Sequence, residues 1–276
     1  MAMKTRAIMG MEGGAEVRSG VRPGPGLRRA LWGGFFALVL AAWAILWLMA
    51  QQQAGGPGAV APGFWTALCG GGAASAAPLA VTLMWAVMAA AMMAPTAAPS
   101  LRTYLDLGHA GAGGAAGFVA LLAGYLAVWA VASLGFGSAQ LALARAGLLT
   151  PAGQSTSLGL SAALCAVAGA YQFSRLKEAC LSQCRAPLTF FLQHWRPGPS
   201  GALEMGLRLG AVCLGCCWAL MGLAFVGGMA NLWWMGLATL LMVFEKLPDL
   251  GRPLTRPLGV VLLAAAAALG GMALAS

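Results

Sequence analysis

Residues 211–221 read AVCLGCCWALM, so that Cys213, Cys216 and Cys217 crowd into one turn of an apolar segment. Residues four apart share one face of a helix, which puts Cys213 and Cys217 together. Cys216 lies about 60° from Cys213 around the helix axis, at the edge of reach. Burying a thiolate in lipid is costly, and a bound cation offsets that cost. The cluster therefore predicts a metal or redox site inside a helix.

A second pair of cysteines lies in the segment YQFSRLKEACLSQCRAPL (171–188). Cys180 and Cys184 are four residues apart, and Arg175, Lys177 and Arg185 are their neighbours. Positive charge close to a thiol favours the thiolate. We expect this pair on the cytoplasmic side of the protein, where it would take up or release the same ligand.

Methionines extend the set of sulfur ligands. Met88 and Met92 follow Met84 at intervals of four, Met93 is adjacent, and Met221 continues the face of Cys213 and Cys217. A methionine stripe at helical spacing is also ordinary packing, and this alternative stays open. Two further cysteines, Cys69 and Cys165, stand alone in the sequence and are expected to be packing residues.

Thiolate and thioether ligands select soft ions, above all Cu(I). Zinc usually takes four Cys or His ligands, and with only His109 and His194 in the chain zinc is less favoured. A membrane thiol–disulfide oxidoreductase is the alternative, because Cys213 and Cys216 form a C-x-x-C motif. A structural or assembly subunit with cysteines as packing residues is the third hypothesis.

Glu245 is a further candidate ligand. It ends an apolar segment beside Lys246, in the sequence VFEKLPDL. Ionisable groups within a span are costly and often functional. One interpretation is an interfacial ion pair in which the lysine reaches toward water. The other is a carboxylate that faces the bundle near its cytoplasmic mouth, where it holds a cation or exchanges a proton.

The composition is that of a membrane protein. Of the 276 residues, 60% are hydrophobic and 8% are charged, whereas soluble domains carry roughly 25% charged residues. We expect an all-α, polytopic bundle of about seven transmembrane spans, each near the ~20 residues that cross a bilayer. The expected spans are 31–50, 77–95, 112–137, 157–173, 206–227, 229–247 and 257–275. Residues 1–29 are predicted to be a disordered cytoplasmic arm, followed by a helical membrane domain over 30–276. The first span is expected to be retained and not cleaved as a signal peptide.

The distribution of positive charge predicts the orientation. Cytoplasmic loops of membrane proteins are rich in Lys and Arg. If the N-terminus is cytoplasmic and the seven spans alternate, every Lys and Arg except Arg145 falls on the cytoplasmic side. This predicts an N-in, C-out topology. The net charge of +9 is then a topology signal, and no nucleic-acid partner is expected.

Three motifs carry a resemblance to a known family: MWAVMAAAMMAPTAAPS (84–100), YQFSRLKEACLSQCRAP (171–187) and the segment 210–247 that ends in FEKL. Together they resemble bacterial membrane proteins catalogued as domain of unknown function 2182, described as predicted metal-binding integral membrane proteins. The similarity covers about 78–250. The shared pattern comprises Met92, Met93, Pro95, Tyr171, Gln172, Lys177, Cys180, Cys184, Arg185, Pro187, Cys213, Gly215, Cys216, Cys217, Trp218, Glu245 and Lys246.

The resemblance implies a metal-binding protein of the bacterial inner (cytoplasmic) membrane. We therefore expect a protein that handles a soft metal, most simply Cu(I), by transport, storage or delivery. A metallochaperone or a cuproenzyme would be its partner, in addition to the lipid bilayer. The chain has no Walker A motif, so ATP-driven pumping by this chain alone is not expected. Binding is favoured over catalysis.

The charge distribution gives the first prediction. Reporter domains fused at Gly198 and after Ser276 should report opposite compartments, with Gly198 cytoplasmic. Paired phosphatase and fluorescent-protein fusions measure this in intact cells. The same compartment for both sites would contradict the alternating seven-span arrangement.

Overall fold

The computed structural model describes residues 24–53, 78–107, 114–229 and 231–275. Helices dominate this part of the chain, and its one β contact is an isolated bridge between Leu149 and Ser155. The all-α class is thus confirmed. The helices are α1 (Pro25–Gln53), α3 (Pro78–Leu107), α4 (Ala115–Arg145), α5 (Leu158–Tyr171), α6 (Arg175–Arg185), α7 (Pro187–His194), α8 (Gly198–Gly222), α9 (Ala224–Gly227), α10 (Leu232–Glu245) and α11 (Pro248–Ala275). Most of the predicted arm, residues 1–23, lies outside the described residues, and α1 includes its last residues.

The number of full-length spans is lower than predicted. Within the described ranges, five helical segments are long and apolar enough to cross a membrane, namely α1, α3, α4, α8 with α9, and α11. The other two predicted spans are the apolar helices α5 and α10, of 14 residues each. At 1.5 Å per residue each is about 21 Å long, short of the ~30 Å hydrocarbon core. The expectation of about seven full spans is therefore wrong.

Polar residues fix where the two short helices begin. The Ser157 side chain accepts a hydrogen bond from the Leu160 backbone N–H at the start of α5. The Asn231 side chain does the same for Trp234 at the start of α10. Such caps satisfy the free N–H groups at a helix N-terminus and fix where the helix begins. Counting apolar residues alone merges the capping segments into the spans.

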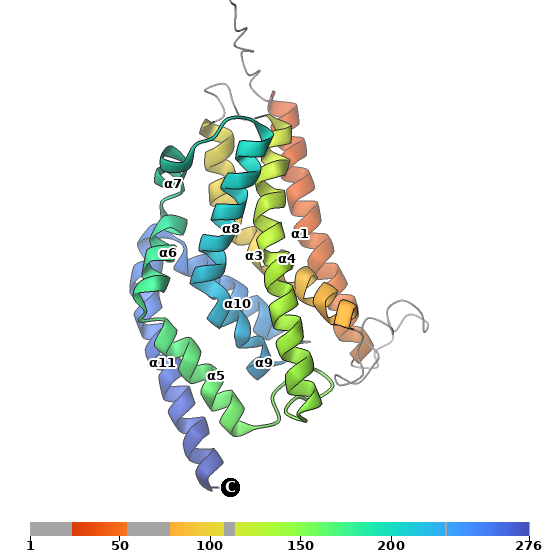
Figure 1. Ribbon diagram of the computed structural model, residues 1–276, viewed down its shortest axis with the longest axis vertical. Coiled ribbons are helices and arrows are strands. Elements are labelled where there is room, and N and C mark those ends of the chain that lie inside the picture. Colours follow the sequence, from red (N-terminus) through yellow and green to blue (C-terminus); the bar gives the residue numbers. More distant parts are fainter. Residues whose placement is uncertain (1–23, 54–77, 108–113, 230, 276) are drawn as a thin grey trace, which may run out of the picture.

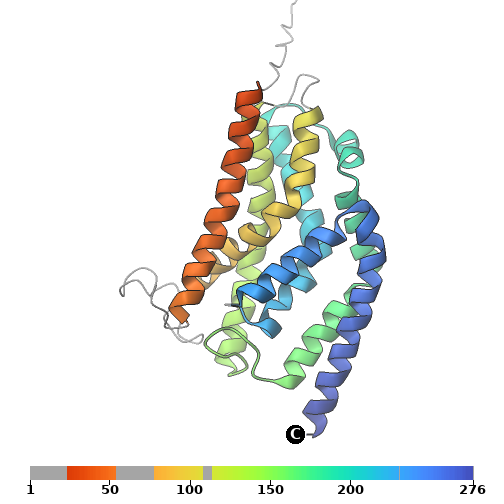
Figure 2. The ribbon, with the colours of Figure 1, turned by 180° about the vertical axis from the view of Figure 1, so that it is seen from behind.

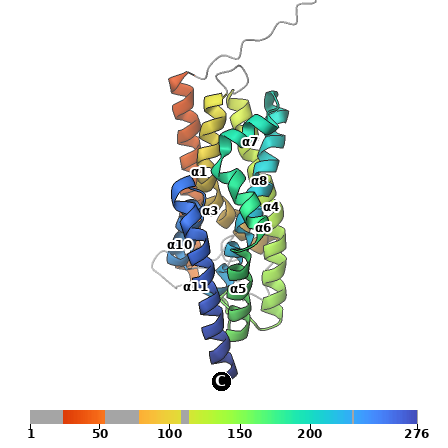
Figure 3. The ribbon, with the colours of Figure 1, turned by 90° about the vertical axis from the view of Figure 1, so that its left-hand side faces the viewer.

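The long helices α1, α3, α4 and α8 lie side by side as an upright bundle (Figure 1). The short helices α5, α6 and α7 follow one another along one side of the bundle, and α10 crosses it obliquely (Figure 2). Helix α11 runs back down beside α5 (Figure 3). The start of α1 and the end of α11 lie at opposite ends of the molecule. Helix α10 ends inside the bundle. The residues that follow it therefore begin part-way along the bundle and not at one of its ends.

Glycines bring α4 and α8 into backbone contact. A Cβ built on Gly206 would lie 2.1 Å from the carbonyl oxygen of Leu121, and one on Gly124 would lie 2.3 Å from that of Leu203. Small residues permit this close approach in membrane bundles. Farther along, a Cβ on Gly210 would lie 2.9 Å from the carbonyl oxygen of Tyr125. The same packing therefore sets Tyr125 against α8 within one turn of the cysteines.

Helix α3 bends where prolines interrupt its hydrogen bonds. Pro95 has no N–H and cannot donate to the carbonyl oxygen of Ala91. The indole N–H of Trp43 on α1 donates to that oxygen instead, at 3.1 Å. A carbonyl left free inside a membrane must find such a partner. Figure 2 shows that α3 is bent, and the helix contains Pro95 and Pro99, with Thr96 directly after Pro95.

Candidate metal centre

The three cysteines of α8 form one compact cluster. Their sulfur atoms all lie within 4.8 Å of one another. The Cys213 and Cys217 sulfurs are 3.7 Å apart, and those of Cys216 and Cys217 are 3.4 Å apart. All three side chains are buried, at 1–2% exposure. Cys216 was expected at the edge of reach, but its sulfur lies within the cluster, because the side chain turns back toward its neighbours.

The thiol hydrogen bonds make Cys213 different from the other two. The sulfur of Cys217 donates to the backbone carbonyl oxygen of Cys213 at 2.8 Å, and that of Cys216 donates to the same oxygen at 3.1 Å. Both thiols therefore have an acceptor for their proton. The sulfur of Cys213 is surrounded by groups that can donate to it.

Those groups come from three other elements. Lys246, the residue after α10, places its Nζ 3.0 Å from the Cys213 sulfur and donates to the Thr96 hydroxyl of α3 at 2.6 Å. The Tyr125 hydroxyl of α4 lies 2.9 Å from the same sulfur and 2.9 Å from the carbonyl oxygen of Met93. Its one proton can serve either acceptor. Four helices thus converge on Cys213.

Lys246 needs a negative charge beside it. The residue is buried, and no carboxylate of the described chain lies within ion-pair distance of it. An uncompensated buried ammonium costs several kcal/mol. The Cys213 sulfur lies 3.0 Å from the Lys246 Nζ and can carry negative charge. Lys246 is therefore placed to balance negative charge on the sulfur cluster.

Glu245 and Lys246 do not pair with one another. Glu245 Oε2 accepts from Lys177 Nζ at 2.9 Å, and both side chains are at most 3% exposed. Arg185 Nε donates to the Glu245 backbone carbonyl oxygen at 2.8 Å. The expected Glu245–Lys246 pair is therefore wrong, whereas the carboxylate does face the interior of the bundle. Among the described residues, the charged partner of Glu245 is Lys177.

The α6 cysteines meet the α8 cluster. A Cβ built on Gly215 would lie 2.7 Å from the Cys180 sulfur, and the Cys184 thiol lies close enough to Cys216 to interact with it. Both cysteine residues of α6 are partly exposed. Basic neighbours were expected to lower the pKa of these thiols. Burial instead raises the pKa of the Cys180 thiol, and the neighbouring cysteines of α8 raise it further.

The candidate methionines are all buried: Met88, Met92, Met93 and Met221 are 0–3% exposed. Helices α3 and α8 run in opposite directions (Figure 1). Thr96 lies 3.9 Å from the Cys213 sulfur. One turn earlier in α3, Met92 is therefore expected near the level of Cys217, one turn later in α8. Burial alone does not separate a ligand from a packing residue.

The remaining candidates lie elsewhere. Cys165 is buried in α5, as expected for a packing residue. His194 ends α7, with Nδ1 2.9 Å from the Phe190 carbonyl oxygen and its ring against that of Phe190. Cys69 and His109 lie outside the described residues.

Thr96 and Tyr125 were missed by the sequence reasoning, and Lys246 was given a surface role. The available signal was their polarity: each is a polar side chain within or at the end of an otherwise apolar segment. The sequence does not show which way these side chains point, because side chains from separate helices meet only through the bend of α3 and the tilt of α10.

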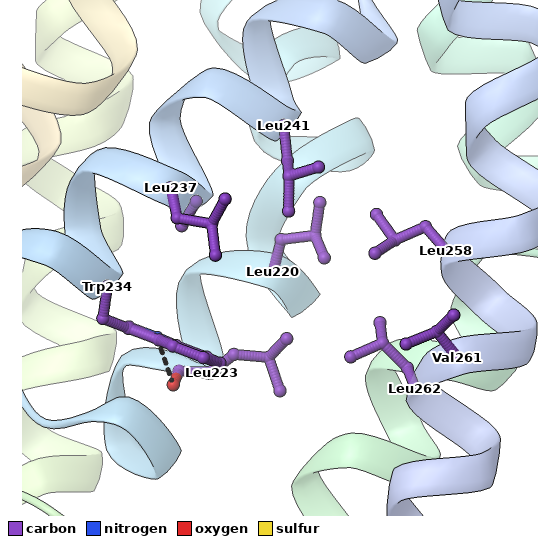
Figure 4. A pocket seen from close by; sticks show the side chains of 9 residues that line it. Leu220, Leu223, Trp234, Leu237, Leu241, Leu258, Val261 and Leu262 are labelled. Carbon is purple, nitrogen blue, oxygen red and sulfur yellow. Dashed lines mark hydrogen bonds between the residues drawn. The ribbon is translucent and has the colours of Figure 1, made fainter.

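A cavity between α8, α10 and α11 offers no ligand to a metal. Its lining is apolar and includes Leu220, Leu237 and Leu258 (Figure 4). Trp234 carries the one polar side-chain group of the lining, and its indole N–H donates to the Leu223 carbonyl oxygen at 3.1 Å. The thiol cluster is therefore the metal-type site of the described residues.

Long apolar helices around a buried cysteine cluster define a membrane-type metal-binding protein. Comparison with protein families identifies the group: the family PpoB2, described as copper chaperone, matches residues 82–269. The chain belongs to this family. The family name differs from the one inferred by resemblance, whereas the metal-binding character agrees. The chain matched neither a curated protein nor a solved structure.

The Lys177–Glu245 pair gives a second prediction. Replacing Lys177 by Met leaves the Glu245 carboxylate buried without its cation, which should destabilise the protein by roughly 3–5 kcal/mol. The double variant Lys177→Met/Glu245→Leu removes both charges and should recover much of this loss. Thermal unfolding in detergent measures both. Additive losses in the double variant would mean that the two charges do not stabilise one another.

Proposed function

We propose that the protein binds Cu(I) through Cys213, Cys216 and Cys217 within the membrane and delivers it to an acceptor protein. The observation that carries this proposal is the compact set of three buried sulfurs, all within 4.8 Å of one another. Cu(I) accepts two or three soft ligands, and thiolates are the ligands it prefers. Membership of the copper chaperone family supports copper as the cargo.

The charges around the site suit a monovalent soft ion. The Lys246 ammonium lies 3.0 Å from the Cys213 sulfur, next to the place where negative charge would build up on ligating thiolates. Thiols give up their protons when they ligate a metal. Lys246 remains to balance part of the negative charge of the copper–thiolate group. Burial keeps water away from the bound ion.

Zinc fits this donor set less well. Structural zinc sites use four Cys or His ligands. No histidine of the described residues touches the cluster, and Glu245 is held by Lys177. The thiol–disulfide oxidoreductase hypothesis requires a substrate dithiol to reach a sulfur, and all three sulfurs belong to side chains that are 1–2% exposed. Burial therefore favours the metal site over disulfide exchange.

We place the protein in the bacterial cytoplasmic membrane with the start of α1 in the cytoplasm. Arg102, which like Arg28 at the start of α1 pairs with Asp106, is 74% exposed at its side chain, and Arg208 is 47% exposed. Positive charge of this kind marks the cytoplasmic face. Copper would then be exchanged between the cluster and a metallochaperone or a cuproenzyme.

The third prediction tests the ligands. Cys213→Ser, Cys216→Ser and Cys217→Ser should each lose tight Cu(I) binding, because each removes one of three sulfurs. Cys165→Ser, another buried cysteine, is the matched control and should bind copper as the wild type does. Copper per purified chain, in competition with a Cu(I) chelator, is the readout. Equal copper in all four variants would contradict the proposal.

The fourth prediction concerns Met92. Met92→Leu should weaken Cu(I) binding several-fold if its thioether completes the site, whereas the swap itself costs less than about 1.5 kcal/mol of stability. Met205→Leu is the control, because Met205 is equally buried in α8 but two turns before Cys213. Chelator titration compares the two. Identical affinities would assign Met92 to packing.

A further inference from the structure

The five cysteines of α6 and α8 form a continuous path from the surface to the interior. Cys180 and Cys184 are partly exposed, whereas Cys213, Cys216 and Cys217 are buried. The two groups meet where the Cys180 sulfur lies against Gly215, directly before Cys216, and where Cys184 lies close to Cys216. An ion bound at the exposed end could therefore reach the interior without leaving sulfur.

The contact between the two groups is held by specific features of α8. Gly215 has no side chain at the place where Cys180 lies, and a Cβ there would be 2.7 Å from that sulfur. The Tyr171 hydroxyl, just before α6, donates to the Gly215 carbonyl oxygen. The Tyr171 ring also packs edge-on against Trp218 at 5.1 Å. These contacts fix the start of α6 on the stretch of α8 that carries the cluster.

Two buried charged residues of α6, Lys177 and Arg185, hold the helix in position. Lys177 binds Glu245 at 2.9 Å, and Arg185 donates both to the Glu245 carbonyl oxygen and to the Thr255 hydroxyl. Helix α6 is therefore tied to α10 and α11 through the residue that precedes Lys246. Its two cysteines, which are partly exposed as residues, are thereby held against the α8 cluster.

We propose that Cys180 and Cys184 form a second, transient Cu(I) site, from which copper passes to the buried cluster by thiolate exchange between Cys184 and Cys216. This inference rests on the proposed function, because it requires copper to be the ligand of the buried cluster. It adds a route by which copper reaches the buried cluster. It also identifies α6 as the helix to which a copper donor delivers its ion.

The exchange is balanced without a redox step. Cu(I) held by the Cys180 and Cys184 thiolates gains a bond to the Cys216 sulfur, and the Cys216 proton passes to the Cys180 sulfur as its Cu–S bond breaks. A bond to the Cys217 sulfur then replaces the bond to Cys184, which takes up the proton of Cys217. Copper stays in the +1 state, and the number of protons on sulfur is unchanged.

The experiment measures how fast the full-length protein in detergent takes copper from a Cu(I)–bathocuproine disulfonate complex. In Cys180→Ser/Cys184→Ser, loading should slow by roughly tenfold or more, as the exchange loses its bridging ligand. The copper bound at equilibrium should stay that of the wild type. Cys184→Ser alone should slow loading more than Cys180→Ser, since Cys184 is the residue that contacts Cys216.

Two further variants separate the route from general damage. Gly215→Ala keeps all five thiols but pushes the Cys180 sulfur away, and it should also slow loading. Cys165→Ser should load at the wild-type rate. Wild-type loading rates in the double variant, or loss of its equilibrium copper, would overturn the transient site. A wild-type protein that binds no copper would instead overturn the proposed function itself.

Discussion

The contact between the Lys246 ammonium and the Cys213 sulfur, 3.0 Å apart in the interior of the bundle, is the constraint on which the other features depend. A buried cation of this kind is tolerated only beside a negative charge and hydrogen-bond acceptors. The tilt of α10 brings the lysine inward, and the bend of α3 presents the Thr96 hydroxyl to it. The glycine contact of α4 and α8 adds Tyr125 on the other side of the sulfur. Removing any of these would leave a charge or a polar group unsatisfied in an apolar interior.

The two charged residues at the end of α10, Glu245 and Lys246, have different partners. Glu245 is neutralised by Lys177, which fastens α6 to the bundle. The next residue, Lys246, is left without a carboxylate among the described residues and is directed to the thiol cluster. Of these two consecutive residues, Glu245 therefore holds α6 in place, and Lys246 contacts the thiol cluster. This explains how α6, with its pair of partly exposed cysteines, is held against the α8 cluster that it is proposed to supply.

The sequence predicted the helical class, the apolar segments and the cysteine cluster, because each depends on local spacing. It did not predict that α5 and α10 are too short to span the bilayer, since the apolar runs extend beyond the residues that are helical, past the cap Asn231 in the case of α10. Cys216 was placed at the edge by an ideal helical wheel, which ignores side-chain rotation. The partners of Lys246 and Glu245 depend on where α10 ends in space, and the spacing of residues along the chain does not determine that position. Thr96 and Tyr125 were missed for the same reason.

The central claim is that Cu(I) is bound by the sulfurs of α8 inside the bundle. X-ray absorption spectroscopy of the copper-loaded protein tests it most directly, because the edge reports the oxidation state and the fine structure reports the ligand atoms. The account predicts a Cu(I) edge and a first shell made of sulfur, which is lost in Cys213→Ser but kept in Cys165→Ser. A first shell of nitrogen or oxygen, or an unchanged sulfur shell in Cys213→Ser, would contradict it.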